Sequence, residues 1–162
     1  WAGALEAGEG PAVPEGDWAA GEELPGFLTV DRAYAWAVSA GTRPGLLVDA
    51  RAGERYRGET EPVDPRAGHI PGAVSAPWAE RLEGGRFKSV ETLKSELRAT
   101  GLSEDTELVA YCGSGVTACH LLLAHARAGF DPAKRRLYEG SWSDWSSDPS
   151  LPAARGPGPR GG

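Results

Sequence analysis

The sequence predicts an α/β fold, in which helices cover both faces of a parallel sheet. Short, continuous apolar runs alternate along the chain with segments whose apolar residues recur every three or four positions. Continuous apolar runs are typical of strands buried on both faces, and the second spacing is typical of amphipathic helices. Strands that alternate with helices are joined by crossover connections, which make the strands parallel.

The first predicted elements are a helix over residues 32–40 and a strand over 46–49. Asp31 is suited to cap the helix, because its carboxylate can accept a backbone N–H of the first turn. Gly41 is suited to end the helix, because glycine readily adopts the left-handed conformation found there. A further short apolar run predicts a strand over 73–76.

The second half of the chain repeats this alternation. Its predicted elements are a helix over 90–99, a strand over 107–111, a helix over 116–128, a strand over 136–138 and a final helical turn. Ser89 is suited to cap the first of these helices, and Ser141 to cap the final turn. Gly101 and Gly129 follow the two longer helices at the positions where glycine commonly ends a helix.

Composition limits the classes of protein to which this chain can belong. The 162 residues carry a formal net charge of −6, and 40% are hydrophobic, as expected for a folded domain. Nucleic-acid binding needs a basic face, and a membrane span needs about 18 consecutive apolar residues, so we expect neither partner. Two cysteines make no disulfide framework, and no ligand spacing indicates a metal or another cofactor.

The segment most informative about function follows the strand predicted over 107–111. Cys112 comes directly after the strand, Gly113 and Gly115 flank a serine, and a helix begins at Val116. The glycines permit a tight loop whose N–H groups converge on an anion, and the start of the helix adds positive potential. A thiolate there is placed to act as a nucleophile. The alternative is a small buried cysteine that only packs after the strand.

Four stretches of the sequence resemble, in order, the motifs of the rhodanese family of sulfurtransferases. They are VDAR at 48–51 with RYRG at 55–58, GHIPGA at 68–73, CGSGVT at 112–117 and YEGSWSDW at 138–145. The third stretch resembles the active-site loop of the 3-mercaptopyruvate branch, and the last has Asp144 where glutamate is usual. The resemblance covers about 45–148 and implies a rhodanese-like, five-stranded parallel sheet with helices on both faces.

The resemblance implies two groups of site residues. The catalytic group is Cys112, Ser114 and Thr117, and the substrate-binding group is Arg55, Arg66, Gly113, Gly115 and Val116. In this family the cysteine takes a sulfur atom from a donor and becomes a persulfide, while loop hydroxyls orient or protonate the leaving group. A planar guanidinium suits the anionic end of the donor.

The implied activity moves a sulfane sulfur from 3-mercaptopyruvate or thiosulfate to cyanide or to a thiol acceptor such as a thioredoxin-like protein. Positions 113 and 114 are neutral, whereas thiosulfate-preferring relatives place cations there, so the loop favours mercaptopyruvate. A cysteine phosphatase or arsenate reductase is the rival enzyme, but the arginine that this chemistry needs six positions after the cysteine is replaced here by Ala118, which excludes a phosphatase. A non-catalytic rhodanese-like module that binds partners stays as the alternative.

The resemblance also predicts how the chain is divided. Residues 1–26, which are rich in Gly, Pro, Ala and Glu, are expected to be the end of a preceding rhodanese-like domain and an interdomain linker. Residues 27–151 are expected to form the catalytic domain, and 152–162 a disordered tail. The preceding domain is therefore an expected partner, and the cytoplasm is the expected compartment.

Overall fold

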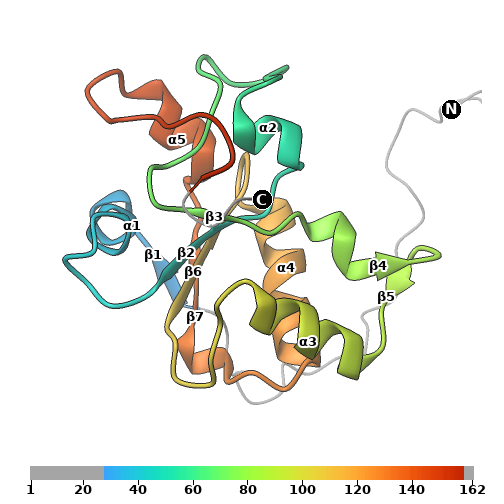
Figure 1. Ribbon diagram of the computed structural model, residues 1–162. Helices are drawn as coiled ribbons and strands as arrows, with labels where there is room; N and C mark the ends of the chain where they lie inside the picture. The colour runs from blue at the N-terminus through green and yellow to red at the C-terminus, as the bar shows by residue number, and fades with distance from the viewer. Residues whose placement is uncertain (1–27, 159–162) are drawn as a thin grey trace, which may run out of the picture.

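The computed structural model describes residues 28–158, and the predicted linker at 1–26 lies outside the described residues (Figure 1). The centre of the fold is a five-stranded sheet in which all paired strands are parallel. Its strands are β1 (Leu28–Val30), β2 (Leu46–Asp49), β3 (Val74–Ser75), β6 (Leu108–Tyr111) and β7 (Arg135–Tyr138). Their order across the sheet is β1-β7-β6-β2-β3, which confirms the predicted parallel α/β fold.

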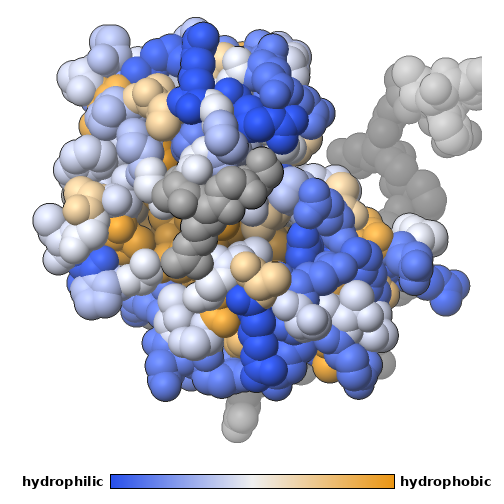
Figure 2. Space-filling view, viewed as in Figure 1, coloured by the Kyte–Doolittle hydropathy of each residue, from blue (hydrophilic) through white to orange (hydrophobic). Residues whose placement is uncertain are grey.

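Helices cover both faces of this sheet, as predicted (Figure 1). On one side lie α1 (Arg32–Ser39) and α5 (Ser141–Ser147), and on the other lie α3 (Val90–Ala99) and α4 (Val116–Arg127). Alternate residues of each strand enter separate cores: Val48 packs with the α3 and α4 side chains, and Leu47 with those of α1 and α5. In the view of Figure 2, hydrophilic residues cover α3, and hydrophobic ones show mainly between the layers.

Shorter elements connect these layers. The helix α2 (Gly53–Arg57) follows β2, and an antiparallel hairpin of β4 (Leu82–Glu83) and β5 (Arg86–Phe87) stands beside the sheet. Gly84 and Gly85 form its turn with φ of 56° and 75°, the backbone that two-residue hairpins require. Two short 3-10 helices, Trp78–Arg81 and Pro132–Lys134, complete the described elements. Within residues 28–158, no helix is long and apolar enough to cross a membrane.

Two of the three predicted helix caps are present. Asp31 accepts the backbone N–H of Tyr34 at 2.8 Å, and Ser89 accepts that of Thr92 at 3.2 Å. The third prediction is wrong, because Ser141 is the first residue of α5 and its side chain makes no cap. Its hydroxyl instead turns back toward the strands, as described below.

The expectation of a disordered tail is wrong for residues 152–158, which pack against the domain. Ala154 and His69 exchange two backbone hydrogen bonds of 2.9 Å as an antiparallel bridge. The indole N–H of Trp145 donates to the carbonyl of Pro152 at 2.8 Å. Backbone hydrogen bonds thus hold this segment, and its Gly- and Pro-rich composition gives no sign of them.

Candidate active site

Cys112 follows the end of β6, the middle strand of the sheet. Ligands of open α/β sheets bind beyond the carboxyl ends of the strands, so this position is the expected one for a reactive group. The residue is 1% exposed, whereas Cys119, three positions inside α4, is exposed. The two free thiols of the described residues therefore lie in very different surroundings.

The loop after Cys112 depends on the conformation of Gly115. This glycine has a φ of 85° and caps the start of α4, in the left-handed region that L side chains rarely adopt. A Cβ at this position would lie 3.0 Å from the carbonyl oxygen of Glu139, so the loop approaches the neighbouring backbone closely. The first N–H groups of α4 have no acceptor within the helix and form its positive end.

The start of α5 holds the same loop from the other side. The backbone N–H of Trp142 donates to the carbonyl of Cys112 at 3.0 Å, and that of Ser143 to the carbonyl of Gly113 at 2.9 Å. The N–H of Cys112 donates to the Ser141 hydroxyl at 3.1 Å. These contacts use the carbonyls of the loop and fix its shape.

A cavity of about 300 Å³ opens onto this loop. Its wall is formed by Arg51, Ala52, Arg55, Trp78, Cys112, Gly113, Ser114, Val116 and Thr117. Six of the eight predicted site residues thus share one cavity. Gly115 shapes the same loop without lining the cavity, and Arg66 lies elsewhere.

Arg55 reaches the cavity from α2 and is held by two buried carboxylates. Its Nη2 lies 2.5 Å from Glu61 Oε1 and 3.1 Å from Asp64 Oδ2. Nη1 passes over the loop, since a Cβ on Gly113 would lie 3.7 Å from it. The two hydrogen bonds that Arg55 makes with described residues both use Nη2, and the buried Nε has no partner among those residues. The guanidinium therefore has unused donor capacity beside Cys112, as an anion-binding group requires.

Arg51 also lines the cavity, although the sequence analysis did not include it among the site residues. Its Nη2 donates to Asp49 and to the carbonyl of Gly68, both at 2.6 Å, and its Nη1 lies 3.2 Å from Glu61. Although burial lowers the pKa of Arg51, the combined contacts with Asp49, Tyr111 and Glu61 raise it more, so the pKa lies above its usual value. Arg51 is a buried, fully engaged cation, and its place in the VDAR motif was the available signal.

Arg66, predicted to bind substrate, has a structural role instead. Its guanidinium donates to four backbone carbonyls around the end of α5, at 2.8 to 2.9 Å. These carbonyls belong to Trp145, Ser146, Asp148 and Leu151. The last carbonyls of a helix have no intrahelical donors, and Arg66 supplies them. Arg66 is therefore not part of the cavity.

Trp78 is a second wall residue that the sequence analysis did not identify. It begins the 3-10 helix after β3, at the same edge of the sheet as Cys112. Its ring packs edge-on against His120 with centroids 4.8 Å apart, and Phe87 lies on the same imidazole at 4.6 Å. Trp78 thus adds an aromatic side chain to the wall of the cavity, and His120 and Phe87 support it from behind the lining.

His69, within the GHIPGA motif, belongs to the supporting structure. Its imidazole stacks on the Tyr56 ring at 3.8 Å, and its Nδ1 donates to the Tyr56 carbonyl at 2.8 Å. Burial lowers its pKa, and His69 does not line the cavity around Cys112. The ring ties the motif to α2.

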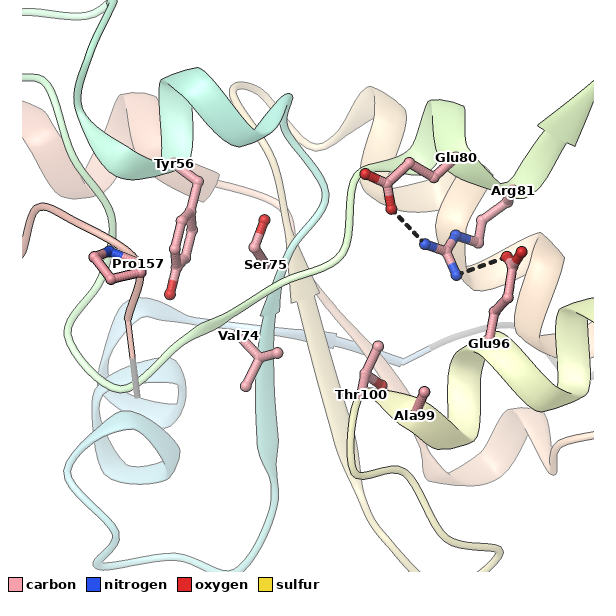
Figure 3. A pocket seen from close by; sticks show the side chains of 9 residues that line it. All are labelled: Tyr56, Val74, Ser75, Glu80, Arg81, Glu96, Ala99, Thr100 and Pro157. Atoms are coloured by element: carbon pink, nitrogen blue, oxygen red, sulfur yellow. Dashed lines mark hydrogen bonds and ion pairs between the residues drawn. The ribbon is translucent and has the colours of Figure 1, made fainter. Parts of the chain in front are cut away.

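A second cavity, of about 210 Å³, lies beside β3 (Figure 3). Figure 3 shows Arg81 at one end, paired with Glu80 at 2.8 Å and Glu96 at 3.0 Å, and Tyr56 at the other. None of its nine lining residues carries a thiol or an imidazole. Among residues 28–158, no group of three or more His, Cys, Asp or Glu side chains is placed to hold a metal. The cavity at Cys112 is therefore the candidate active site.

Known proteins match this chain over the same region. A probable 3-mercaptopyruvate sulfurtransferase of Pseudomonas aeruginosa is 55% identical over 118 residues, which are 70% of this chain and 40% of that protein. A putative thiosulfate sulfurtransferase of Mycobacterium tuberculosis is 44% identical over 121 residues, which are 74% of this chain and 42% of that protein. The chain thus spans about two fifths of the length of these relatives.

A solved structure of a known protein also shares the fold of this chain. The crystal structure of the Tum1 protein from Saccharomyces cerevisiae superposes with a TM-score of 0.67 and 25% sequence identity, over 78% of this chain and 46% of that chain. Residues 31–148 match the rhodanese-like domain, and this range includes strands β2, β3, β6 and β7 of the sheet, its helices and the cavity at Cys112. The chain therefore belongs to the rhodanese family.

Proposed function

We propose that this domain is the catalytic half of a two-domain sulfurtransferase, which moves sulfane sulfur through a persulfide on Cys112. The observation that supports this most is the shared cavity, which is lined both by a thiol at a strand end and by an incompletely paired arginine. A non-catalytic module would need neither group. Relatives named as mercaptopyruvate and thiosulfate sulfurtransferases support the same activity.

The proposed reaction has two displacement steps. The Cys112 thiolate attacks the sulfur of 3-mercaptopyruvate, a sulfur–sulfur bond forms, and the carbon–sulfur bond breaks. The electron pair leaves on carbon, which takes the proton of the donor's thiol and departs as pyruvate; thiosulfate would release sulfite instead. An acceptor thiolate or cyanide then attacks the outer sulfur and returns the Cys112 thiolate.

The surrounding residues have distinct proposed roles in these steps. The loop from Gly113 to Val116 and the positive end of α4 stabilise the persulfide anion. Ser114 and Thr117 orient the leaving group or carry its proton, since both line the cavity beside Cys112. Arg55 binds the anionic end of the donor through Nη1, which lies over the loop at Gly113.

We propose 3-mercaptopyruvate as the preferred donor. Positions 113 and 114 are neutral, so a single guanidinium, that of Arg55, meets the donor with unused capacity. One guanidinium matches one carboxylate, whereas thiosulfate brings two negative charges. The proposed acceptor is a small thiol, cyanide or a thioredoxin-like protein. The proposed compartment is the cytoplasm, where a thiol of this kind stays reduced.

Mass spectrometry of the intact protein tests the persulfide. After brief exposure to 3-mercaptopyruvate and removal of the donor, we expect the wild type to gain the mass of one sulfur atom and to lose it with cyanide. Cys119→Ser is the matched control, because it removes the exposed thiol and leaves the cavity intact. It should gain the same mass, and Cys112→Ser should gain none. Absence of the gain in the wild type with both donors would favour the binding module.

A further inference from the structure

Five buried or half-buried charged side chains form a continuous network of ion pairs beside Cys112. Arg51 lies between Asp49 and Glu61, with N–O distances of 2.6 and 3.2 Å, and Glu61 continues to Arg55 at 2.5 Å. Asp64 completes the network on the other side of Arg55, with an N–O distance of 3.1 Å. The side chains of Glu61 and Asp64 are each 4% exposed, so water screens these contacts little.

The formal charges of this network do not balance. Two guanidiniums face three carboxylates, which leaves one negative charge in excess beside the donor cavity. Although burial raises the pKa of Glu61, hydrogen bonds from Arg55 and from two backbone N–H groups lower it below its usual value. An anionic donor therefore meets an arginine whose charge is already opposed by its neighbours.

The two carboxylates on Arg55 differ in what else they hold. Glu61 also binds Arg51 and accepts the backbone N–H groups of Val63 and Asp64, so the loop depends on it. Asp64 is bound by Arg55 and by the hydroxyl of Ser143, which donates at 2.6 Å. The Asp64 charge can therefore be removed with less damage to the loop.

We propose that Asp64 is a positioning residue that sets the charge preference of the donor site. Its carboxylate holds the Nη2 end of Arg55 and offsets its charge, which leaves enough attraction for one carboxylate but disfavours a dianion. The inference rests on the proposed function and adds a cause for donor choice. It predicts that the protein discriminates against thiosulfate through Asp64 as well as through the neutral positions 113 and 114 of the loop.

The variant Asp64→Asn tests this directly, because the amide oxygen can still accept from Ser143 while the charge is lost. We expect the ratio of kcat/KM for thiosulfate to that for 3-mercaptopyruvate to rise about tenfold, the scale of one charge-assisted contact. The change should lie mainly in the KM for thiosulfate, because Asp64 acts on binding through Arg55. Asp64→Ser should shift the ratio in the same direction, and Asp64→Glu, which keeps the charge, should not.

Glu59→Gln is the matched control, since it removes the same charge from the same segment. Glu59 is exposed and pairs with Arg57 at 2.7 Å, away from the cavity walls, so the donor ratio should stay unchanged. A merely structural role for Asp64 would lower the use of both donors together and leave the ratio unmoved, which would overturn the inference. Persulfide mass is measured in parallel: if Cys112 gains sulfur in the wild type but the ratio is unmoved, the proposed function stands and this inference fails.

Discussion

The hydroxyl of Ser141 accepts the backbone N–H of Cys112 at 3.1 Å and donates to the carbonyl of Tyr138 at 2.9 Å. Both Ser141 and Cys112 are buried, at 0% and 1% exposure. Among residues 28–158, Ser141 is the one non-glycine residue with positive φ, at 55°. This left-handed conformation directs its side chain back to the ends of β6 and β7, so the fold accepts backbone strain to hold the proposed nucleophile.

Removal of this contact is expected to destabilise the domain. Ser141→Ala should cost about 1–3 kcal/mol, because the buried N–H of Cys112 loses its acceptor. Ser141→Gly loses the same bond but adopts positive φ freely, so its cost should be smaller. Urea unfolding measures both, with Ser150→Ala as the control at an exposed hydroxyl. Equal stability of the wild type and Ser141→Ala would contradict the role of this bond.

Substitutions at two glycines with nearly equal φ can distinguish the effect of backbone strain from the effect of steric contact. Gly115 and Gly129 have φ of 85° and 83°, and a Cβ would meet the Glu139 carbonyl at the first but nothing within 4 Å at the second. An alanine at either position should cost about 1–2 kcal/mol for its left-handed backbone. Gly115→Ala alone should also slow persulfide formation, because the loop at Cys112 must move. Equal persulfide rates in the two variants would show that this close approach does not matter.

Arg66→Ala is expected to lower stability and to leave donor binding unchanged. Its guanidinium supplies donors to four backbone carbonyls, and their loss should cost about 2–4 kcal/mol in urea unfolding. Arg98→Ala is the control, because that exposed arginine pairs with Glu104 on the surface and should cost less than about 1 kcal/mol. A higher KM for both donors with unchanged stability would restore the substrate role that the sequence suggested for Arg66.

The contrast between Cys112 and Arg66 shows which features the sequence reveals. Cys112 sits in a strand–loop–helix unit whose glycines, caps and apolar runs are contiguous, so its position at the sheet end follows from local pattern. The partners of Arg66 lie 79 to 85 positions away, at the end of a helix whose placement depends on the whole sheet. Spacing from Arg55 carries no information about such a contact.

The same distinction explains the other differences. Ser141 resembles a helix cap in sequence, because serine is a common N-cap residue, but tertiary contact with Cys112 determines its conformation. Asp64 appears only as a charge in a turn until the fold brings it to Arg55. Residues 152–158 lack an apolar pattern, and the backbone pairing that orders Ala154 is invisible to composition.

His125 predicts how stability depends on pH. It lies on α4, is 1% exposed, and its Nδ1 has no hydrogen-bond partner among the described residues. Burial, with repulsion from Arg135 and Arg81, lowers the pKa of His125 to about 3 from 6.5. The folded state therefore keeps this imidazole neutral where the unfolded chain takes up a proton.

The sign follows from that difference in proton uptake. Stability contributed by neutral His125 is complete above pH 6.5 and is lost progressively as the pH falls towards 3, because protons favour the unfolded chain. Between pH 6.5 and 5, the free energy of unfolding should fall by about 1.6 kcal/mol through this residue. His125→Leu should remove that part of the slope, and the remainder comes from the other groups with shifted pKa, among them His69 and the carboxyls of Glu61 and Glu107, whose pKa values are also lowered. Urea unfolding at several pH values measures it, and an identical slope in the variant would exclude His125 as the cause.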